Sequence, residues 1–86
     1  MGGHVYEGGW TYGKKDGIGV LQITNGEMYK GEFQNDEFNG KGTYFYENGD
    51  IYDGDWVDGK RNGDGIMKCA DGTKIMGSWK NDIYLD

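Results

Sequence analysis

One spacing of 23 residues organises nearly the whole sequence and limits what the chain can fold into. Tyrosines recur at this spacing as Tyr6, Tyr29 and Tyr52, and Ile75 takes the fourth position. Glycines and bulky aromatic residues keep the same step, as Gly8, Gly31, Gly54 and Gly77; Trp10, Phe33, Trp56 and Trp79; Gly17, Gly40 and Gly63; Gly19, Gly42 and Gly65. A constant period of this length is typical of repeat architectures, in which each unit needs its neighbours to bury its apolar face.

Composition limits the fold further and excludes some classes of partner. The 86 residues, 35% of them hydrophobic, are too few for a thick layered core. A flexible linker would have no reason to keep aromatic residues in register with 18 glycines. The net charge of −6 opposes binding to nucleic acid and to anionic lipid. We expect a cytoplasmic chain without a cofactor, and the single cysteine, Cys69, fits a reducing compartment.

Two strands are predicted in each module. In the third module, Tyr52, Gly54 and Trp56 alternate with mostly polar residues, as in a half-buried strand over residues 49–56. A link rich in turn-forming residues follows at 57–62, and β-branched and aromatic residues are common at the positions that match 63–69. The second strand is therefore expected after a six-residue link.

The ends of the modules carry turn signals. Asn25-Gly26, Asn48-Gly49 and Asp71-Gly72 each separate one second strand from the next first strand. Such pairs favour type I′ hairpin turns, in which both central residues have positive φ. The predicted fold class is all-β, a single-layer antiparallel β-meander of tandem hairpins.

The glycines inside the second strand lower its stability, so other contacts must offset the loss. Gly63 and Gly65 would each weaken a strand by about 0.5–1 kcal/mol relative to alanine. A buried aromatic ring removes roughly 150–250 Å² from water, so we expect rings of the first strand to lie flat over this bare backbone. The residues assigned this structural role are Tyr6, Trp10, Gly17, Gly19, Tyr29, Phe33, Gly40, Gly42, Tyr52, Trp56, Gly63, Gly65 and Trp79.

The pattern Tyr-x-Gly-x-Trp, a polar link, Gly-x-Gly and a closing Asn-Gly or Asp-Gly resembles the MORN (membrane occupation and recognition nexus) repeat. The resemblance covers residues 3–79. It implies three repeats at 3–25, 26–48 and 49–71, with a partial fourth repeat or C-terminal cap at 72–86. It also implies a curved, twisted sheet that acts as a scaffold or adaptor and binds a protein through a groove, and it implies a link to phospholipids.

The fourth unit departs from this pattern. Ile75 replaces the anchoring tyrosine, and Leu85 and Asp86 stand where Asn62 and Gly63 stand in the third unit. Two interpretations stay open, a terminal cap over the last strand or a piece of a longer array. The second is favoured, because members of this family commonly carry more units.

Few residues are candidates for catalysis or metal binding. Asp50, Asp53, Asp55 and Asp58 form an acidic cluster, but Asp58 stands where a calcium loop requires glycine, so a solvated or partner-steering surface is preferred. The only histidine, His4, and the only cysteine, Cys69, lie in different modules and make a poor metal site. Cys69 is interpreted as a small core residue. No catalytic residue and no metal ligand are predicted, and the chain is expected to be non-enzymatic.

Aromatic residues beyond the repeat pattern mark the candidate partner-binding site, which consists of Phe38, Tyr44, Phe45 and Tyr46. Neighbours on a strand point to opposite faces, so these rings cannot all be buried on one side. Extra cross-strand packing and a protein-binding patch both stay open. The unpaired edges, 3–10 and 72–79, favour a homodimer through an edge or groove.

The predicted function is a non-enzymatic scaffold or adaptor for protein–protein interaction, with the cytoskeleton as one candidate location. One alternative is a membrane-targeting module for phosphoinositide or anionic phospholipid, which the net charge disfavours. It lacks a continuous basic stripe. The cations that follow a first strand could at most line one edge of the sheet; they are Lys14, Lys15, Lys60, Arg61 and Lys80. A further alternative is the accessory repeat region of a larger enzyme.

Overall fold

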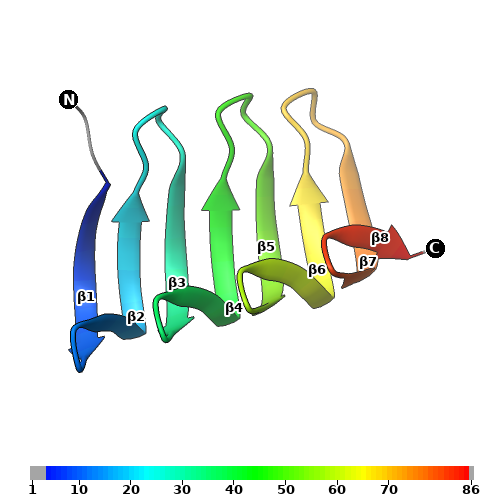
Figure 1. Cartoon of the computed structure of the whole chain (residues 1–86). Helices are drawn as coiled ribbons and strands as arrows, with labels where there is room; N and C mark the ends of the chain where they lie inside the picture. Colours follow the sequence, from blue (N-terminus) through cyan, green and yellow to red (C-terminus); the bar gives the residue numbers. More distant parts are fainter. Residues whose placement is uncertain (1–3, 86) are drawn as a thin grey trace.

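Eight antiparallel strands form one sheet in which each strand pairs only with its neighbours in the sequence. The computed structural model describes residues 4–85, and Figure 1 shows the strands side by side in chain order. The strands are β1 (Val5–Thr11), β2 (Lys14–Gln22), β3 (Met28–Gln34), β4 (Glu37–Phe45), β5 (Ile51–Val57), β6 (Lys60–Lys68), β7 (Lys74–Lys80) and β8 (Ile83–Leu85). The predicted all-β, single-layer antiparallel meander is confirmed.

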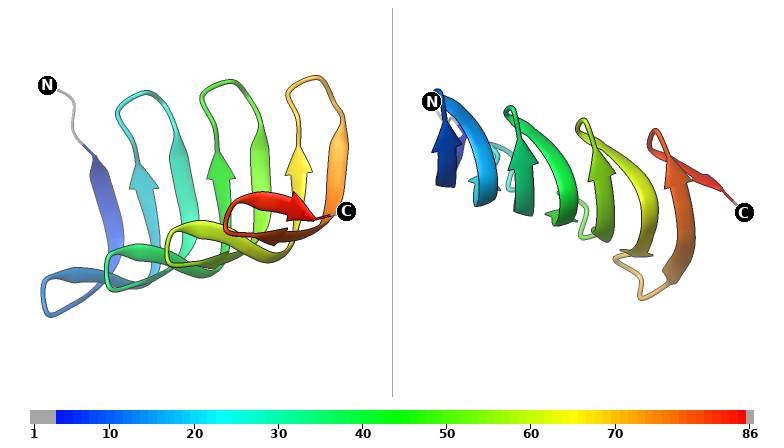
Figure 2. Two further views of the ribbon diagram at one scale, coloured as in Figure 1. Left: turned by 45° about the vertical axis from the view of Figure 1, so that its right-hand side comes forward. Right: turned by 90° about the horizontal axis from the view of Figure 1, so that it is seen from below.

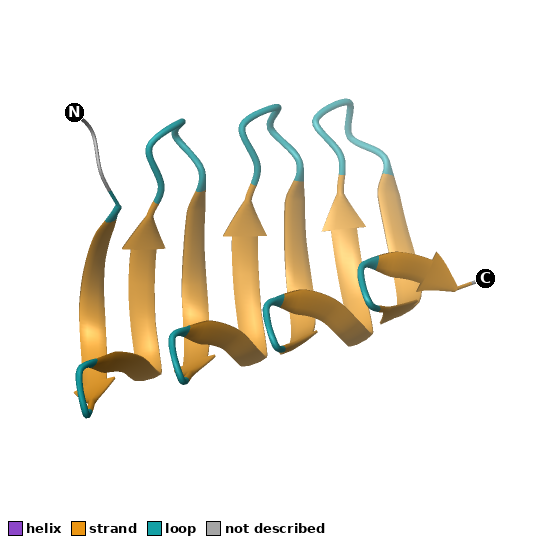
Figure 3. Cartoon of the chain, viewed as in Figure 1, coloured by secondary structure: helices purple, strands orange, loops and turns teal. Residues whose placement is uncertain are grey.

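The described part of the chain consists of strands and turns alone, as Figure 3 shows. The principal extents are 39 × 27 × 16 Å, so the shortest dimension fits one sheet and its side chains. No helix among residues 4–85 is long and apolar enough to cross a membrane.

The links between paired strands are shorter than predicted. In the third unit β5 continues to Val57 and β6 begins at Lys60, so most of the expected link at 57–62 is strand. Only Asp58 and Gly59 form the turn, with φ of 50° and 82°. Positive φ at both central residues is the requirement of a type I′ turn, whose twist matches that of the flanking strands. Asn35-Asp36 and Asn81-Asp82 have the same conformation.

The Asn-Gly and Asp-Gly turns also differ from the prediction. Gly26, Gly49 and Gly72 have positive φ, whereas the residue before each of them does not. The amide of Gly26 donates to the carbonyl of Ile23 at 3.0 Å, which closes a four-residue turn one position earlier than expected. This hydrogen bond and the φ pattern match a type I turn followed by a left-handed glycine. The type I′ assignment of these turns was therefore wrong.

Each anchoring tyrosine lies over a glycine of the following strand. A Cβ atom at Gly19, Gly42 or Gly65 would collide with the ring of Tyr6, Tyr29 or Tyr52, respectively. The three hydroxyl groups donate to the carbonyl three residues further along, at 2.8, 2.9 and 3.2 Å. Burial, and after it the charge of Asp55, raises the pKa of Tyr52 to about 12, so this hydroxyl stays protonated as a donor.

The other glycines of the Gly-x-Gly pairs have a different role from the one predicted. No ring covers Gly17, Gly40 or Gly63, and their φ values are 91°, 105° and 112°. They lie where the pairing register shifts. Gly8 pairs with Gly19 and Trp10 with Lys15, so the segment between Gly8 and Trp10 on β1 faces a longer segment on β2. The extra residues bend the strand, as in a β-bulge. Figure 2 shows the resulting curve in β2, β4 and β6.

The buried aromatic rings form a continuous ladder along the sheet. Phe33 has one tyrosine ring on each side, Tyr6 and Tyr29, both at 5.1 Å between centroids and nearly perpendicular. Trp56 repeats this arrangement one unit later, between Tyr29 at 5.5 Å and Tyr52 at 5.2 Å. Edge-to-face pairs of this kind each contribute about 0.5–1.5 kcal/mol beyond the area they bury.

The ends of the ladder differ from each other. Trp10 packs against one ring, that of Tyr6, with the Lys15 ammonium group 6.0 Å from its own ring centre. It remains 57% exposed, so it departs from the core role expected for it. Trp79 at the other end is 4% exposed, because Tyr84 of β8 packs against it at 4.9 Å. Tyr84 also approaches Gly77 and donates to the carbonyl of Met76 at 3.0 Å. Tyr84 thus places an aromatic ring against the fourth unit, in which Ile75 stands at the position of the anchoring tyrosine.

We predict that Gly42→Ala lowers the free energy of unfolding by about 3 kcal/mol, because the new methyl group would overlap the buried ring of Tyr29. The control is Gly72→Ala, where φ is +95° but the space is open, with an expected loss of about 1 kcal/mol. Urea unfolding followed by tryptophan fluorescence measures both. Equal losses in the two variants would contradict the importance of the ring contact.

Candidate protein-binding groove

The inner face of the bent sheet carries a row of large side chains. Cross-strand pairing aligns Tyr6, Leu21, Tyr29, Tyr44, Tyr52, Met67 and Ile75 along this face. Tyr29 and Tyr52 are fully buried, whereas Leu21, Tyr44 and Met67 are partly buried and pack against them. The bent ends of β2, β4 and β6 return beside this row, and together they form what we call the inner groove.

One residue of each bent strand covers an anchoring ring. Phe38 stacks on Tyr29 at 3.8 Å with an interplanar angle of 11°. The ammonium group of Lys15 lies 5.6 Å from the Tyr6 ring centre, and the guanidinium group of Arg61 lies 5.9 Å from that of Tyr52. Cations at such distances are attracted by the ring face. Lys15, Phe38 and Arg61 have equivalent positions in the repeat. Each therefore contacts the ring of an anchoring tyrosine, although their side chains differ.

The type I′ turn of the next unit holds each covering residue in place. The backbone amide of Arg61 donates to the carboxylate of Asp82 at 2.9 Å, and the amide of Asp82 donates back to the carbonyl of Arg61 at 3.0 Å. Lys15 and Asp36 exchange the same pair of bonds at 2.7 and 2.9 Å. Sequence reasoning missed this position, although alignment of the chain at its own period would have placed Lys15, Phe38, Arg61 and Tyr84 together.

The four predicted partner-binding residues do not form one patch. Phe38, Tyr44 and Tyr46 lie on the inner face and pack against the buried core. Phe45 points to the opposite face, where cross-strand pairing places it between Met28 and Ile51. The inner face therefore holds three of the residues, and their packing is compatible with both alternatives left open by the sequence.

Tyr46, which packs against Tyr44, lines a hollow of the groove. Their ring centres are 4.6 Å apart, and Arg61 lies 6.0 Å from the Tyr46 ring. The hollow has a volume of about 310 Å³ and is lined by Glu27, Tyr46, Glu47, Asn48, Asp50, Arg61 and Met67. Three carboxylates against one guanidinium give its rim a negative charge.

Two of the rim carboxylates also join neighbouring units. Glu27 accepts hydrogen bonds from the Tyr44 hydroxyl at 2.6 Å and from the amide of Glu47 at 3.0 Å. These bonds, that from Tyr44 first, lower the pKa of Glu27 and keep the carboxylate ionised at neutral pH. Asp50 accepts from the amide of Ala70 at 2.8 Å, one repeat further on.

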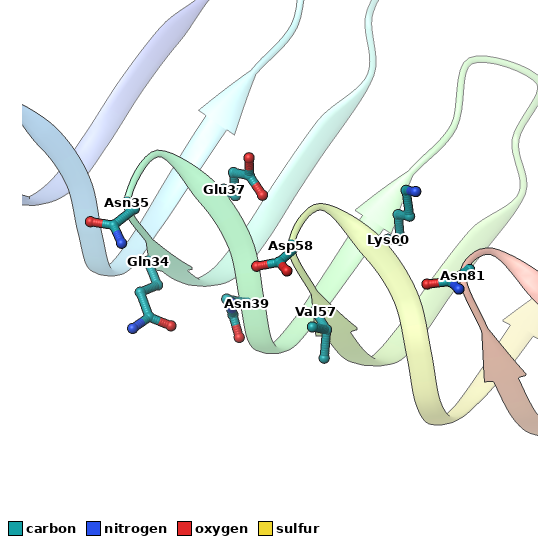
Figure 4. Close-up of a pocket in the computed structure, with 8 residues that line it drawn as sticks. All are labelled: Gln34, Asn35, Glu37, Asn39, Val57, Asp58, Lys60 and Asn81. Atoms are coloured by element: carbon teal, nitrogen blue, oxygen red, sulfur yellow. The ribbon is translucent and has the colours of Figure 1, made fainter.

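A larger hollow of about 630 Å³ lies along the type I′ turns. Figure 4 shows that its side chains come from successive turns and the strand ends beside them, and that they do not converge on a common point. The lining residues are Gln34, Asn35, Glu37, Asn39, Val57, Asp58, Lys60 and Asn81. With one apolar side chain and no ring, this surface offers no anchor for a partner.

The acidic cluster of the third unit is divided among separate contacts. Asp53 accepts from the hydroxyl of Thr43 at 3.3 Å, and Asp55 pairs with Lys41 and accepts from the amide of Asp64. Among residues 4–85, no group of three or more His, Cys, Asp or Glu side chains could hold a metal ion. Burial, with Asp50 and Asp71 nearby, raises the pKa of the Cys69 thiol and disfavours a reactive thiolate.

The repeat architecture matches a known family. The family model described as MORN repeat matches three consecutive segments of this chain, residues 6–28, 29–51 and 52–74. Each segment begins at an anchoring tyrosine. The match includes most of the residues that build the inner groove.

We predict that Tyr44→Phe lowers the free energy of unfolding by about 1 kcal/mol at neutral pH, because it removes a hydroxyl donor from the Glu27 carboxylate. The folded-state pKa of Glu27 is lowered, so this stabilisation is present above the unfolded-state pKa. It is lost as pH falls through the folded-state pKa. Urea unfolding at neutral and acidic pH checks this.

Tyr12→Phe is the matched control for Tyr44→Phe, because the Tyr12 side chain is 99% exposed. It should have no effect at either pH. A loss from Tyr44→Phe that does not change with pH would contradict the role given to Glu27.

Proposed function

This chain belongs to the MORN repeat family, and we propose that it is a non-enzymatic scaffold or adaptor that binds a protein segment in the inner groove. The family supports a repeat-containing binding or scaffold module in general. The observation that favours this groove is the hollow beside Tyr46, where partly buried aromatic and aliphatic side chains lie inside a rim of carboxylates. Aromatic residues are frequent anchors at protein interfaces.

The chemistry of the groove favours a particular kind of partner. Met67 and Tyr46 provide apolar surface, and Glu27, Glu47 and Asp50 outnumber the single Arg61 at the rim. A segment with apolar side chains on one side and flanking lysines or arginines would match both features. We therefore propose a basic, amphipathic segment of another protein as the ligand, with cytoskeletal proteins among the candidates.

The contacts of the basic residues give less support to a lipid ligand. Arg61 forms an ion pair with Asp82 at 3.1 Å, and Lys15 lies 3.7 Å from the carboxylate of Asp36. Binding to anionic headgroups would use cations that are free to meet the membrane, with about 1 kcal/mol gained for each. Two of the five candidate cations already have carboxylate partners within the fold.

Selection from a random peptide library displayed on phage tests the proposal. We expect enrichment of peptides with apolar residues flanked by Lys or Arg, and their affinity for the purified protein should fall as salt rises. Vesicles containing anionic phospholipid form the second arm of the test and should not bind. Selection of acidic peptides, or binding to the vesicles alone, would contradict the proposal.

Variants of two adjacent residues locate the site. We predict that Tyr46→Ala weakens binding of the selected peptides about tenfold or more, measured by calorimetry. Phe45→Ala removes a ring from the opposite face of the same segment and should leave the affinity unchanged. Circular dichroism checks that both variants are folded. Equal affinity of the wild type and Tyr46→Ala would exclude the inner groove.

A further inference from the structure

The outer edge of β1 is the least protected edge of the sheet. Within residues 4–85, β1 pairs with β2 only, so the backbone groups on its other side have no partner strand. Exposed edges in natural proteins are usually guarded by lysine, proline or a covering segment. β1 has one charged residue, Glu7, and no lysine or proline. Val5 and Trp10 are 56% and 57% exposed.

The other end of the sheet finishes in an edge strand of three residues, β8, and so short an edge offers little surface for pairing. β8 pairs with the last residues of β7, Ser78, Trp79 and Lys80, and Tyr84 covers the indole ring of Trp79. Lys74 and Lys80 lie at the two ends of β7. Figure 2 shows β8 folded beside β7, whereas β1 stands open at the opposite end. The two edges therefore differ in their tendency to pair.

Inside the sheet, each unit adds a ring and a backbone hydrogen bond to the unit before it. The side chain of Phe33 or Trp56 lies against the tyrosine of the preceding unit, and Asp36 and Gly59 donate to the preceding covering residue. Trp10 has the same position in its unit, and within residues 4–85 the ring it packs against is that of Tyr6 in the same unit. A strand added at β1 that carries an aromatic residue would cover Trp10 with a ring, as Phe33 and Trp56 are covered.

We propose that β1 of one copy pairs antiparallel with β1 of a second copy, with Gly8 of both copies at the two-fold axis. All seven strand pairs in the sheet are antiparallel. Pairing of β1 with β7 of another copy would instead place equivalent strands side by side in parallel. A two-fold axis perpendicular to the sheet keeps the inner faces of both copies on the same side and closes the assembly as a dimer.

The sequence of β1 is self-complementary in this register. Trp10 of each copy lies opposite Tyr6 of the other, which covers the exposed indole ring with aromatic surface. Glu7 lies opposite Gly9, so the two carboxylates do not meet. The row of glycines that crosses the sheet, which includes Gly8 and Gly19, continues through the axis.

Sedimentation equilibrium across a wide range of protein concentration tests the dimer. The wild type should have twice the chain mass of 9.6 kDa. Val5→Lys combined with Thr11→Lys alters two exposed side chains and would place lysines opposite each other in the dimer, so this variant should sediment as a monomer. Met76→Lys combined with Ile83→Lys, the matched change at the other end of the sheet, should remain dimeric.

A monomeric wild type at every concentration, or a dimer that only the Met76 and Ile83 changes dissociate, would overturn the proposal. Circular dichroism of each variant separates loss of pairing from loss of folding. Because peptide binding is not involved, the result is independent of the proposed function of the inner groove.

Disulfide cross-linking tests the register. In a Cys69→Ala background, Val5→Cys and Thr11→Cys are prepared as separate proteins. Directly opposite residues in antiparallel strands have Cα atoms about 4.5–5.5 Å apart, within reach of a disulfide. A covalent dimer should therefore form when the two proteins are mixed under mild oxidation, and far less in either protein alone. Equal cross-linking in the single samples, or none in the mixture, would contradict the Gly8 axis.

Discussion

The contact between each anchoring tyrosine and a glycine of the following strand is the constraint on which the other contacts depend. Only a residue without a side chain leaves room for Tyr29 over Gly42, and the hydroxyl then reaches the carbonyl of Glu32. The fixed ring presents one edge to the next unit and one face to the covering residue. Because these contacts join neighbouring units only, we expect stability to be shared along the chain rather than held in a central core.

The sequence predicted the strands and their order because the 23-residue period fixes which rings and glycines meet. Turn types were predicted poorly. Asn25-Gly26 was expected to form a type I′ turn, but only Gly26 has positive φ, whereas Asn35 and Asp36, which carry a weaker signal, both adopt it. Turn propensity alone could not show that β3 and β4 stay paired as far as Gln34 and Glu37, which leaves two residues for the turn. The covering position was missed because Lys15, Phe38 and Arg61 share no residue type.

The candidate site was harder to predict than the fold for a physical reason. An excess of aromatic residues identifies the central unit but does not show how each ring divides its surface between packing and solvent. Tyr44 packs against Phe38 and donates to Glu27, while its neighbour Phe45 turns to the other face. Glu27 and Asp50 both link successive turns and contribute to the negative rim. The same carboxylates therefore serve architecture and candidate recognition.

The positive-φ glycines of the bent strands have a consequence for how such repeats can diverge. Gly17, Gly40 and Gly63 determine where β2, β4 and β6 turn, yet none of them lies under a ring. The residues that bend the strands are thus different from the residues that hold neighbouring units together. A change near one bend could widen or narrow a single segment of the groove while the neighbouring ring contacts persist, so an array could adapt to differently shaped ligands one module at a time.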